Sequence, residues 1–424
     1  MDSWKNRLFS GVFDGELSAL YGPDGAQRAR YAGLIDDYVN LFGEEPALLC
    51  SAPGRTELCG NHTDHQRGRV LCGSVTRDIL AAAGPTGDAR IVLRSAGFGE
   101  VSLVLDDLGI REEEKGTSAA LLRGVAAALR SRGLAVGGFR AVLTSDVPAG
   151  GGLSSSAAFE ILAGALFSRL FNHDSVDAMT LAKAGQFAER EYFGKPSGLL
   201  DQAACACGGI TMIDFADPED PAVERIGFDY RAHGYVLCAV DTRTSHADLT
   251  GDYAAIPADM GAVARALGQP FLRYVNYTDL DGLPGFSPAV LDRARHFFFE
   301  NARVPHMAEA LRREEMDRVL FLMNESGRSS RELLRNVIPA SHPERTDMAV
   351  ALDRAESLLA GKGAWRIHGG GFAGCIQCLV PAEEFESFRS AMDGWYGDGA
   401  CFELRIRPCG VHFLGTGIPE AAHA

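Results

Sequence analysis

Apolar residues recur at helical spacing near the start of the chain and at strand spacing further on. Residues 1–47 are polar, with an apolar stripe that predicts an amphipathic helix: Tyr31, Ile35, Tyr38, Leu41 and Phe42. Residues 48–145 alternate short apolar runs with turns, which predicts strands, several of them antiparallel. These runs are Ala47–Cys50, Val70–Val75, Ile91–Leu93, Val101–Leu105 and Phe139–Leu143.

The rest of the chain contains some segments with helical spacing of apolar residues and others with strand spacing. Helices are predicted at Gly116–Ala127, Ala157–Leu170 and Ala178–Phe193, and in most of residues 254–345. Further strands are predicted at Gly208–Asp214, Tyr235–Asp241, Cys375–Val380 and Phe402–Pro408. This order predicts an α+β protein with two lobes. We expect an N-terminal helical extension (1–46), an N-terminal lobe (47–215) and a C-terminal lobe (216–424).

Composition narrows the class of protein. The chain has 424 residues, of which 46% are hydrophobic, enough for a large buried core. Its net charge of -15 makes nucleic acid a poor partner. No apolar stretch is long enough to span a membrane. Residues 1–9 are polar and include Lys5 and Arg7, unlike a secretory signal. We therefore expect a cytoplasmic protein, and the sequence is compatible with a monomer.

Ten cysteines fit a reducing compartment. Cys375 and Cys378 form a CxxC, which could indicate a metal or redox site. It lies in the apolar stretch 374–380 and has no second pair at zinc-site spacing. Packing in the core is therefore the favoured interpretation.

A glycine-rich loop carries the most specific signal. It runs from Pro148 through three glycines and three serines to Ala157, and an apolar helix follows. Contiguous glycines let backbone amides turn toward one point, and a helix N-terminus attracts phosphate. A serine hydroxyl there can ligate a metal held between phosphates. The loop has neither the lysine of a Walker motif nor the spacing of a dinucleotide fingerprint. The alternative is a turn in which Ser154 caps the helix.

Two further segments carry side chains suited to ligand binding or catalysis. The segment 52–64 is dense in polar side chains that suit a polyol: Arg55, Glu57, Asn61, His62 and Asp64. Glu189 and Asp201 lie twelve residues apart and could present two carboxylates to one cleft, one for Mg²⁺ and one for an attacking hydroxyl. The alternatives are a solvated loop and two ordinary surface acids.

These runs together resemble the galactokinase family of the GHMP kinases. The serine-rich loop resembles the second motif of that superfamily, and 366–375 resembles the third. The resemblance extends from about residue 37 to residue 415. It implies a two-lobed fold, an active site in the cleft between the lobes, and the cofactors ATP and Mg²⁺. It also implies transfer of a phosphoryl group from ATP to the anomeric hydroxyl of galactose.

The resemblance also implies roles for individual residues. Asp201 would be catalytic, with Arg55 beside it, and Ser156 and Glu189 would hold Mg²⁺. The residues implied around the ATP phosphates are Pro148, Gly150, Gly151, Gly152, Leu153, Ser154, Ser155, Ser156 and Ala157. Those implied around the sugar are Arg55, Glu57, Asn61, His62, Asp64, Gly198, Asp201 and Tyr253.

Some positions depart from the family pattern. Glu57 stands at the usual asparagine, Asn61 at the usual glutamate, and His65 at the usual aromatic residue. The replaced glutamate contacts the sugar near its sixth carbon, so Asn61 leaves two alternatives open. Either another sugar, such as a galacturonate or an arabinose, is the substrate, or Glu57 restores the carboxylate. A non-catalytic sugar sensor is disfavoured, because Ala157 and Ala158 fill the positions that such relatives lack.

Overall fold

The structure is a computed structural model that describes residues 3–23, 25–95, 99–148, 152–245 and 248–418. The larger of its two sheets has the order β12-β1-β2-β5-β3-β4, and β6 followed by β7 extends from the other half of the long strand β2. Its strands are β1 (Leu48–Cys59), β2 (Arg69–Pro85), β3 (Arg90–Ser95), β4 (Gly99–Val104), β5 (Phe139–Ser145), β6 (Ile210–Asp214), β7 (Ala222–Ile226) and β12 (His412–Phe413).

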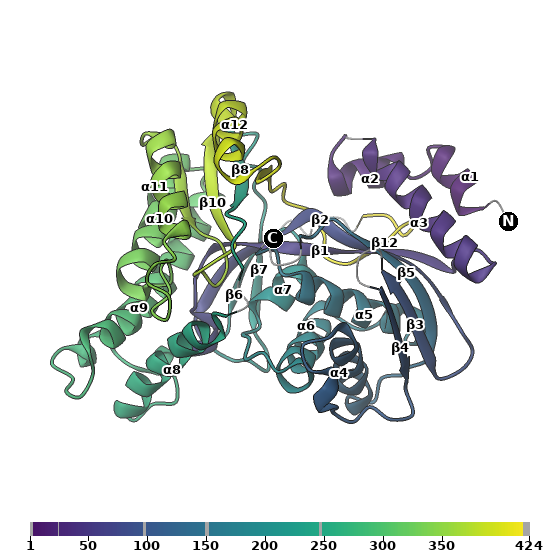
Figure 1. Ribbon diagram of the computed structural model, residues 1–424, viewed down its shortest axis with the longest axis horizontal. Coiled ribbons are helices and arrows are strands. Elements are labelled where there is room, and N and C mark those ends of the chain that lie inside the picture. Colours follow the sequence, from purple (N-terminus) through teal and green to yellow (C-terminus); the bar gives the residue numbers. More distant parts are fainter. Residues whose placement is uncertain (1–2, 24, 96–98, 149–151, 246–247, 419–424) are drawn as a thin grey trace.

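Helices cover both faces of the large sheet (Figure 1). One face carries α1 (Trp4–Phe9), α2 (Asp14–Tyr21) and α3 (Ala26–Phe42). The other carries α4 (Ser118–Ser131), α5 (Ser155–Phe171), α6 (Ala178–Phe187) and α7 (Leu200–Cys207). Side chains alternate between the faces along each strand. In β1, for example, Leu48 and Cys50 join the core beside α5 while Leu49 packs with α3.

The second lobe is built on an antiparallel sheet with the order β11-β8-β10-β9. Its strands are β8 (Tyr235–Asp241), β9 (Ala364–Ile367), β10 (Cys375–Pro381) and β11 (Cys401–Glu403). Its helices are α8 (Thr250–Ala266), α9 (Pro288–Arg312), α10 (Met316–Ser329), α11 (Asp347–Leu359) and α12 (Phe385–Tyr396). Among the described residues, no helix is both long and apolar enough to cross a bilayer.

Most predicted elements are confirmed, and several are longer than predicted. The segment Phe402–Pro408 is an exception, because β11 ends at Glu403 and Ile406 makes only an isolated bridge to Val75. The short strands β7, β9 and β12 were not predicted. The lobe boundaries remain a prediction, to which the structure adds that β12 returns the end of the chain to the first lobe, where it pairs with β1.

The CxxC cysteines lie on one strand, β10, three residues apart. Side chains at an odd separation on a strand point to opposite faces. Accordingly, Cys375 is buried in the core shared with the first lobe and Cys378 in the core of the second sheet. The two thiols therefore do not converge on one ligand, and packing explains both.

Asp78 on β2 joins three distant parts of the chain inside the first lobe. It is fully buried and accepts hydrogen bonds from Arg30 (2.5 Å), Tyr21 (2.5 Å) and Arg407 (3.1 Å). Its backbone carbonyl also accepts from the amide of Asp146, just before the glycine-rich loop. The N-terminal helices are thus tied to the segment that leads into this loop.

We predict that Asp78→Ala lowers the free energy of unfolding by about 3–5 kcal/mol, because it leaves buried guanidinium groups without their carboxylate. Chemical denaturation monitored by fluorescence would measure the change. As a control, Glu100→Ala removes the exposed Arg94–Glu100 pair and should cost less than about 1 kcal/mol. Equal effects of the two substitutions would contradict a stabilising role for the buried network.

Candidate active site

Arg55 lies at an irregularity of β1. The register with β2 shifts between Pro53 and Arg55, and a Cβ on the intervening Gly54 would come within 2.8 Å of Leu153 O. The backbone amide of Arg55 donates to the same carbonyl at 3.1 Å. A bulge re-aims the side chain at its position. Here it brings Arg55 against the glycine-rich loop.

Asp201 connects Arg55 to that loop. Arg55 Nε donates to Asp201 Oδ1 at 2.7 Å and Arg55 Nη1 donates to Gly152 O, while Ser154 Oγ donates to Asp201 Oδ2. Burial favours the neutral acid, but the charges of Arg55 and Lys195 outweigh it and lower the pKa of Asp201 to about 2. The carboxylate is therefore ionised at any pH near neutrality.

The glycine-rich loop is described at Pro148 and from Gly152 onward, whereas Gly150 and Gly151 lie outside the described residues. Gly152 and Ser154 both have left-handed backbones, with φ of 74° and 58°. Because the Ser154 hydroxyl is bonded to Asp201, it does not cap α5. The first-turn amides of α5 can therefore face an anion.

Other residues of the loop contribute differently from the serines. The side chains of Leu153 and Ala157 are fully buried in the hydrophobic core. Leu153 bonds through its carbonyl to Arg55. Only the backbone of these two residues can therefore take part in binding. Ser155, the first residue of α5, is half-buried.

Glu189 lies in the π-helical turn Ala188–Phe193 that continues α6, and its carboxylate is almost fully buried. Ser156 Oγ donates to Glu189 Oε1 at 2.9 Å, and Gln202 Nε2 donates to Oε2 at 2.8 Å. Ser156 and Glu189 thus meet at one point beside the loop. The same Gln202 amide donates to the buried Glu160 at 2.9 Å.

Lys195 brings a positive charge to this group of acids. Its Nζ donates to Glu189 Oε1 at 2.8 Å, the oxygen that Ser156 also contacts. Burial opposes the ammonium, but the charges of Glu189 and Asp201 raise the pKa of Lys195 above its ordinary value. By contrast, burial and the charge of Glu189 raise the pKa of Glu160 well above its ordinary value. This environment therefore favours the uncharged form of Glu160.

Asp64 lies next to the start of α7. Its carboxylate accepts from the amides of His65 (2.9 Å) and Leu200 (3.4 Å). A Cβ on Gly198 would overlap this carboxylate, so any side chain there would force Asp64 to move. Burial and the charge of Asp201 raise the pKa of Asp64 to about 6.

His62 and Tyr253 meet the third glycine motif. His62 Nε2 lies 3.0 Å from the carbonyl of Gly370, and Tyr253 OH donates to the carbonyl of Gly371. The His62 contact joins the predicted sugar segment to the second lobe, whereas the contact of Tyr253, which comes from α8, lies within that lobe. Both side chains are only partly buried.

Glu57 and Asn61 are more deeply buried than His62 and Tyr253. Glu57 Oε1 accepts from Arg366 (2.5 Å) and from Asn61 Nδ2 (3.0 Å). Asn61 Nδ2 also donates to Gly369 O, and Asn61 Oδ1 accepts from Asn336 and Ser330. All four hydrogen-bonding positions of the Asn61 amide are therefore used within the protein, which argues against a direct sugar contact by this residue.

Sequence reasoning missed the residues that support this segment from α9. Glu300 is fully buried and accepts from the amides of Gly60 (3.0 Å) and Asn61 (3.4 Å). His296 Nε2 donates to the Asn61 carbonyl at 2.9 Å, since a carbonyl can only accept, and the pKa of His296 is lowered by burial to about 3. His296 and Glu300 are four residues apart and therefore lie on one face of α9. Nothing in the sequence around them indicates a contact with Asn61.

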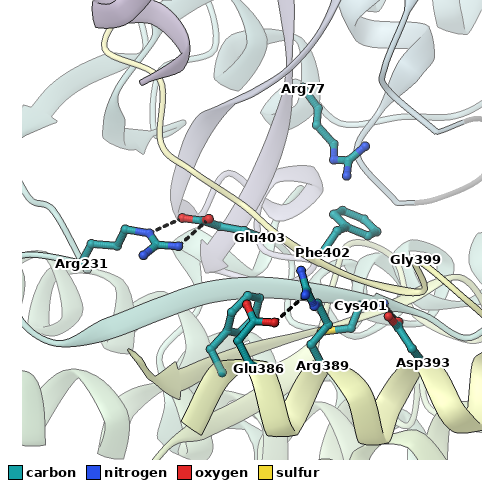
Figure 2. A pocket seen from close by; sticks show the side chains of 10 residues that line it. Arg77, Arg231, Glu386, Arg389, Asp393, Gly399, Cys401, Phe402 and Glu403 are labelled. Atoms are coloured by element: carbon teal, nitrogen blue, oxygen red, sulfur yellow. Dashed lines mark hydrogen bonds and ion pairs between the residues drawn. The ribbon is translucent and has the colours of Figure 1, made fainter. Parts of the chain in front are cut away.

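A separate pocket of about 570 Å³ lies between β2 and α12 (Figure 2). Arg231 is paired with Glu403, and Arg389 with Glu386. Arg77 lies 4.4 Å from the Phe402 ring. None of the described site residues predicted above lines this pocket. Arg231 and Arg389 are thus paired with acids, whereas Arg77 faces the Phe402 ring.

Family models match two parts of the chain. GHMP kinases N terminal domain matches residues 120–209, which include the glycine-rich loop, Glu189 and Asp201. Galactokinase galactose-binding signature matches residues 36–85, which include Arg55 and Asp64.

Individual proteins are similar along most of their length. A galactokinase of Streptomyces coelicolor is 32% identical over 368 residues, which are 85% of this chain and 92% of the relative. The crystal structure of Lactococcus lactis galactokinase complexed with galactose superposes with a TM-score of 0.78 at 23% identity, covering 90% of this chain and 99% of that one. Streptococcus pneumoniae phosphomevalonate kinase, solved with phosphomevalonate and AMPPNP, gives 0.58 at 13% identity, covering 85% and 100%.

The two-lobed fold, in which Ser154 and Ser156 of the glycine-rich loop bond to Asp201 and Glu189, is that of a small-molecule kinase of the GHMP class. Within that class, the chain belongs to the galactokinase family. It is a phosphotransferase with a sugar hydroxyl as acceptor.

We predict that kcat/KM for the sugar falls about tenfold per pH unit below pH 6, because protonation of Asp64 removes an acceptor for sugar hydroxyls. Asp201 is already ionised there and cannot cause the inflection. Initial rates recorded at saturating nucleotide from pH 5 to 8 would measure this fall in kcat/KM. Asp64→Asn should abolish the inflection and lower kcat/KM. An unchanged inflection in that variant would assign the titration to another group.

Proposed function

We propose that the protein transfers the γ-phosphoryl group of ATP to the anomeric hydroxyl of galactose. The observation that carries this proposal is the Arg55–Asp201 pair, which is joined on one side to Gly152 and Ser154 of the glycine-rich loop. A hydroxyl placed against Asp201 would face a triphosphate held by that loop. Phosphoryl transfer depends mainly on such positioning and on neutralising charge.

The nucleotide would be held by the loop and the first turn of α5. Ser156 and Glu189 fit a magnesium ion, because a hydroxyl and a buried carboxylate oxygen converge at 2.9 Å. Among the described residues, no three His, Cys, Asp or Glu side chains could hold a metal by themselves. This suits Mg²⁺, which commonly takes one or two carboxylates and completes its shell with phosphates and water. The ion would supply charge neutralisation between the phosphates.

Asp201 would orient the attacking hydroxyl. A carboxylate with a pKa near 2 is a weak base, so it accepts a hydrogen bond from the hydroxyl more readily than it removes the proton early in the reaction. Arg55 would keep this carboxylate ionised and stabilise negative charge that develops near the loop.

The sugar would lie between Asp64 and Gly198 on one side and His62 and Tyr253 on the other. These groups bring a carboxylate and two polar aromatic side chains from both lobes to the same region. Glu57 and Asn61 would act from behind them, through Arg366 and the third glycine motif. The comparisons favour galactose over the galacturonate or arabinose alternatives.

We infer the cellular location and the type of partner from the composition of the chain. All ten cysteines are buried, and the chain carries a net charge of -15. We place the protein in the cytoplasm, acting on small molecules without nucleic acid, and a monomer would suffice because both lobes of one chain contribute to the site.

We predict that Asp201→Asn lowers kcat at least about a hundredfold while the fold is kept, because the amide preserves shape but loses the charge that faces the hydroxyl. A coupled ADP-release assay measures turnover, and thermal unfolding checks the fold. Asp36→Asn, on the exposed carboxylate that pairs with Lys5, should leave turnover unchanged. Near-normal activity of Asp201→Asn would remove this residue from the mechanism.

We predict that galactose has the highest kcat/KM among galactose, 6-deoxygalactose, galacturonate and arabinose. The same ADP-release assay with ATP and Mg²⁺ would compare the four sugars. This expectation rests on the similarity to galactokinases and on the match to the galactose-binding signature. Faster turnover of galacturonate would overturn the assignment of galactose.

A further inference from the structure

The glycine-rich loop brings no cation of its own. Residues 141–168 contain neither lysine nor arginine. A triphosphate carries several negative charges, and transfer of its terminal group requires that they be neutralised. Side chains from other segments must therefore supply positive charge in addition to any metal ion.

Arg55 can meet this need only in part. It is 5% exposed, its Nε is bonded to Asp201, and its Nη1 is bonded to the carbonyl of Gly152. Two of its five N–H groups thus join the loop to Asp201, and its charge is already paired with that carboxylate. Arg55 therefore adds little net positive charge to the loop.

Lys195 differs from Arg55 in its exposure and in its hydrogen-bond partners. It lies between the π-helical turn that carries Glu189 and the helix that carries Asp201. Its side chain is 53% exposed, and its ammonium donates to Glu189 Oε1 at 2.8 Å. Ser156 donates to the same oxygen. The ammonium therefore stands beside the point where Ser156 and Glu189 converge.

One carboxylate oxygen cannot serve an ammonium and a metal ion in the same place. When Glu189 gives its oxygens to a magnesium ion, Lys195 loses this partner and is repelled by the new charge. A lysine head on its flexible stem can move by several ångströms without a change in the backbone. Phosphate oxygens on the adjacent loop would then be the nearest anions that remain free.

We propose that Lys195 is a phosphate-binding catalytic residue that rests on Glu189 in the free enzyme and moves to the terminal phosphate of ATP when the nucleotide and its metal bind. This rests on the proposed kinase function. It assigns to the segment after Glu189 the lysine that the glycine-rich loop itself lacks.

Binding of a non-hydrolysable ATP analogue, measured by calorimetry with Mg²⁺ and no sugar, tests the proposal. Lys195→Met keeps the length of the side chain and removes its charge. It should weaken analogue binding by roughly tenfold to a hundredfold, as expected for a lost charged hydrogen bond. Lys195→Arg should retain most of the affinity. Galactose binding without nucleotide should be the same in both variants.

A matched control is Lys183→Met on α6, where the lysine contacts Glu219. It should leave analogue binding and turnover unchanged. If Lys195 only held its loop in place, Lys195→Met would lower the melting temperature and weaken galactose and the analogue alike. That result, or wild-type affinity and kcat in Lys195→Met, would overturn the proposal. If the wild type phosphorylated no sugar, the proposed function would fail, whereas the analogue comparison would still report on Lys195.

Discussion

The ion pair between Arg55 and Asp201 is the contact on which the arrangement of the site depends. Its 2.7 Å hydrogen bond joins a bulge of β1 to the first turn of α7, and Arg55 and Asp201 each bond to the glycine-rich loop as well. Three segments that are up to 146 residues apart are thereby fixed around one carboxylate. The pair is largely desolvated, so the field of the arginine holds Asp201 ionised.

A buried polar network in each lobe supports the Arg55–Asp201 pair. In the first lobe, the buried Asp78 network ties the N-terminal helices and Arg407 to the strand just before the loop. In the second lobe, Glu300 and His296 hold the turn at residues 60–61 from α9. Both networks are buried and polar, which makes them costly to break and specific in geometry. The N-terminal helices thus pack on the first lobe and support the segment that leads into the glycine-rich loop.

Sequence patterns predicted the parts of the molecule whose signals are local. The beginnings of the long strands β1 and β2 and the helix after the glycine-rich loop follow from apolar periodicity, whereas the polar second half of β1 does not; Glu189 and Asp201 lie within one short run. Strands of two to five residues such as β12 and β7 carry too little pattern and are fixed by their neighbours. Likewise, Glu300 lies 240 residues from its partner Gly60, so only the folded chain shows that the two meet.

Glu57 and Asn61 show why a departure from a family pattern can be misjudged from sequence. Taken alone, Asn61 at a usual glutamate indicates a lost negative charge and a different sugar. In the structure the two side chains bond to each other, and Glu57 pairs with Arg366, which is fully buried. A buried guanidinium requires a carboxylate nearby. Since the usual asparagine is also exchanged, the segment still holds one carboxylate and one amide, and the carboxylate is the one that pairs with Arg366.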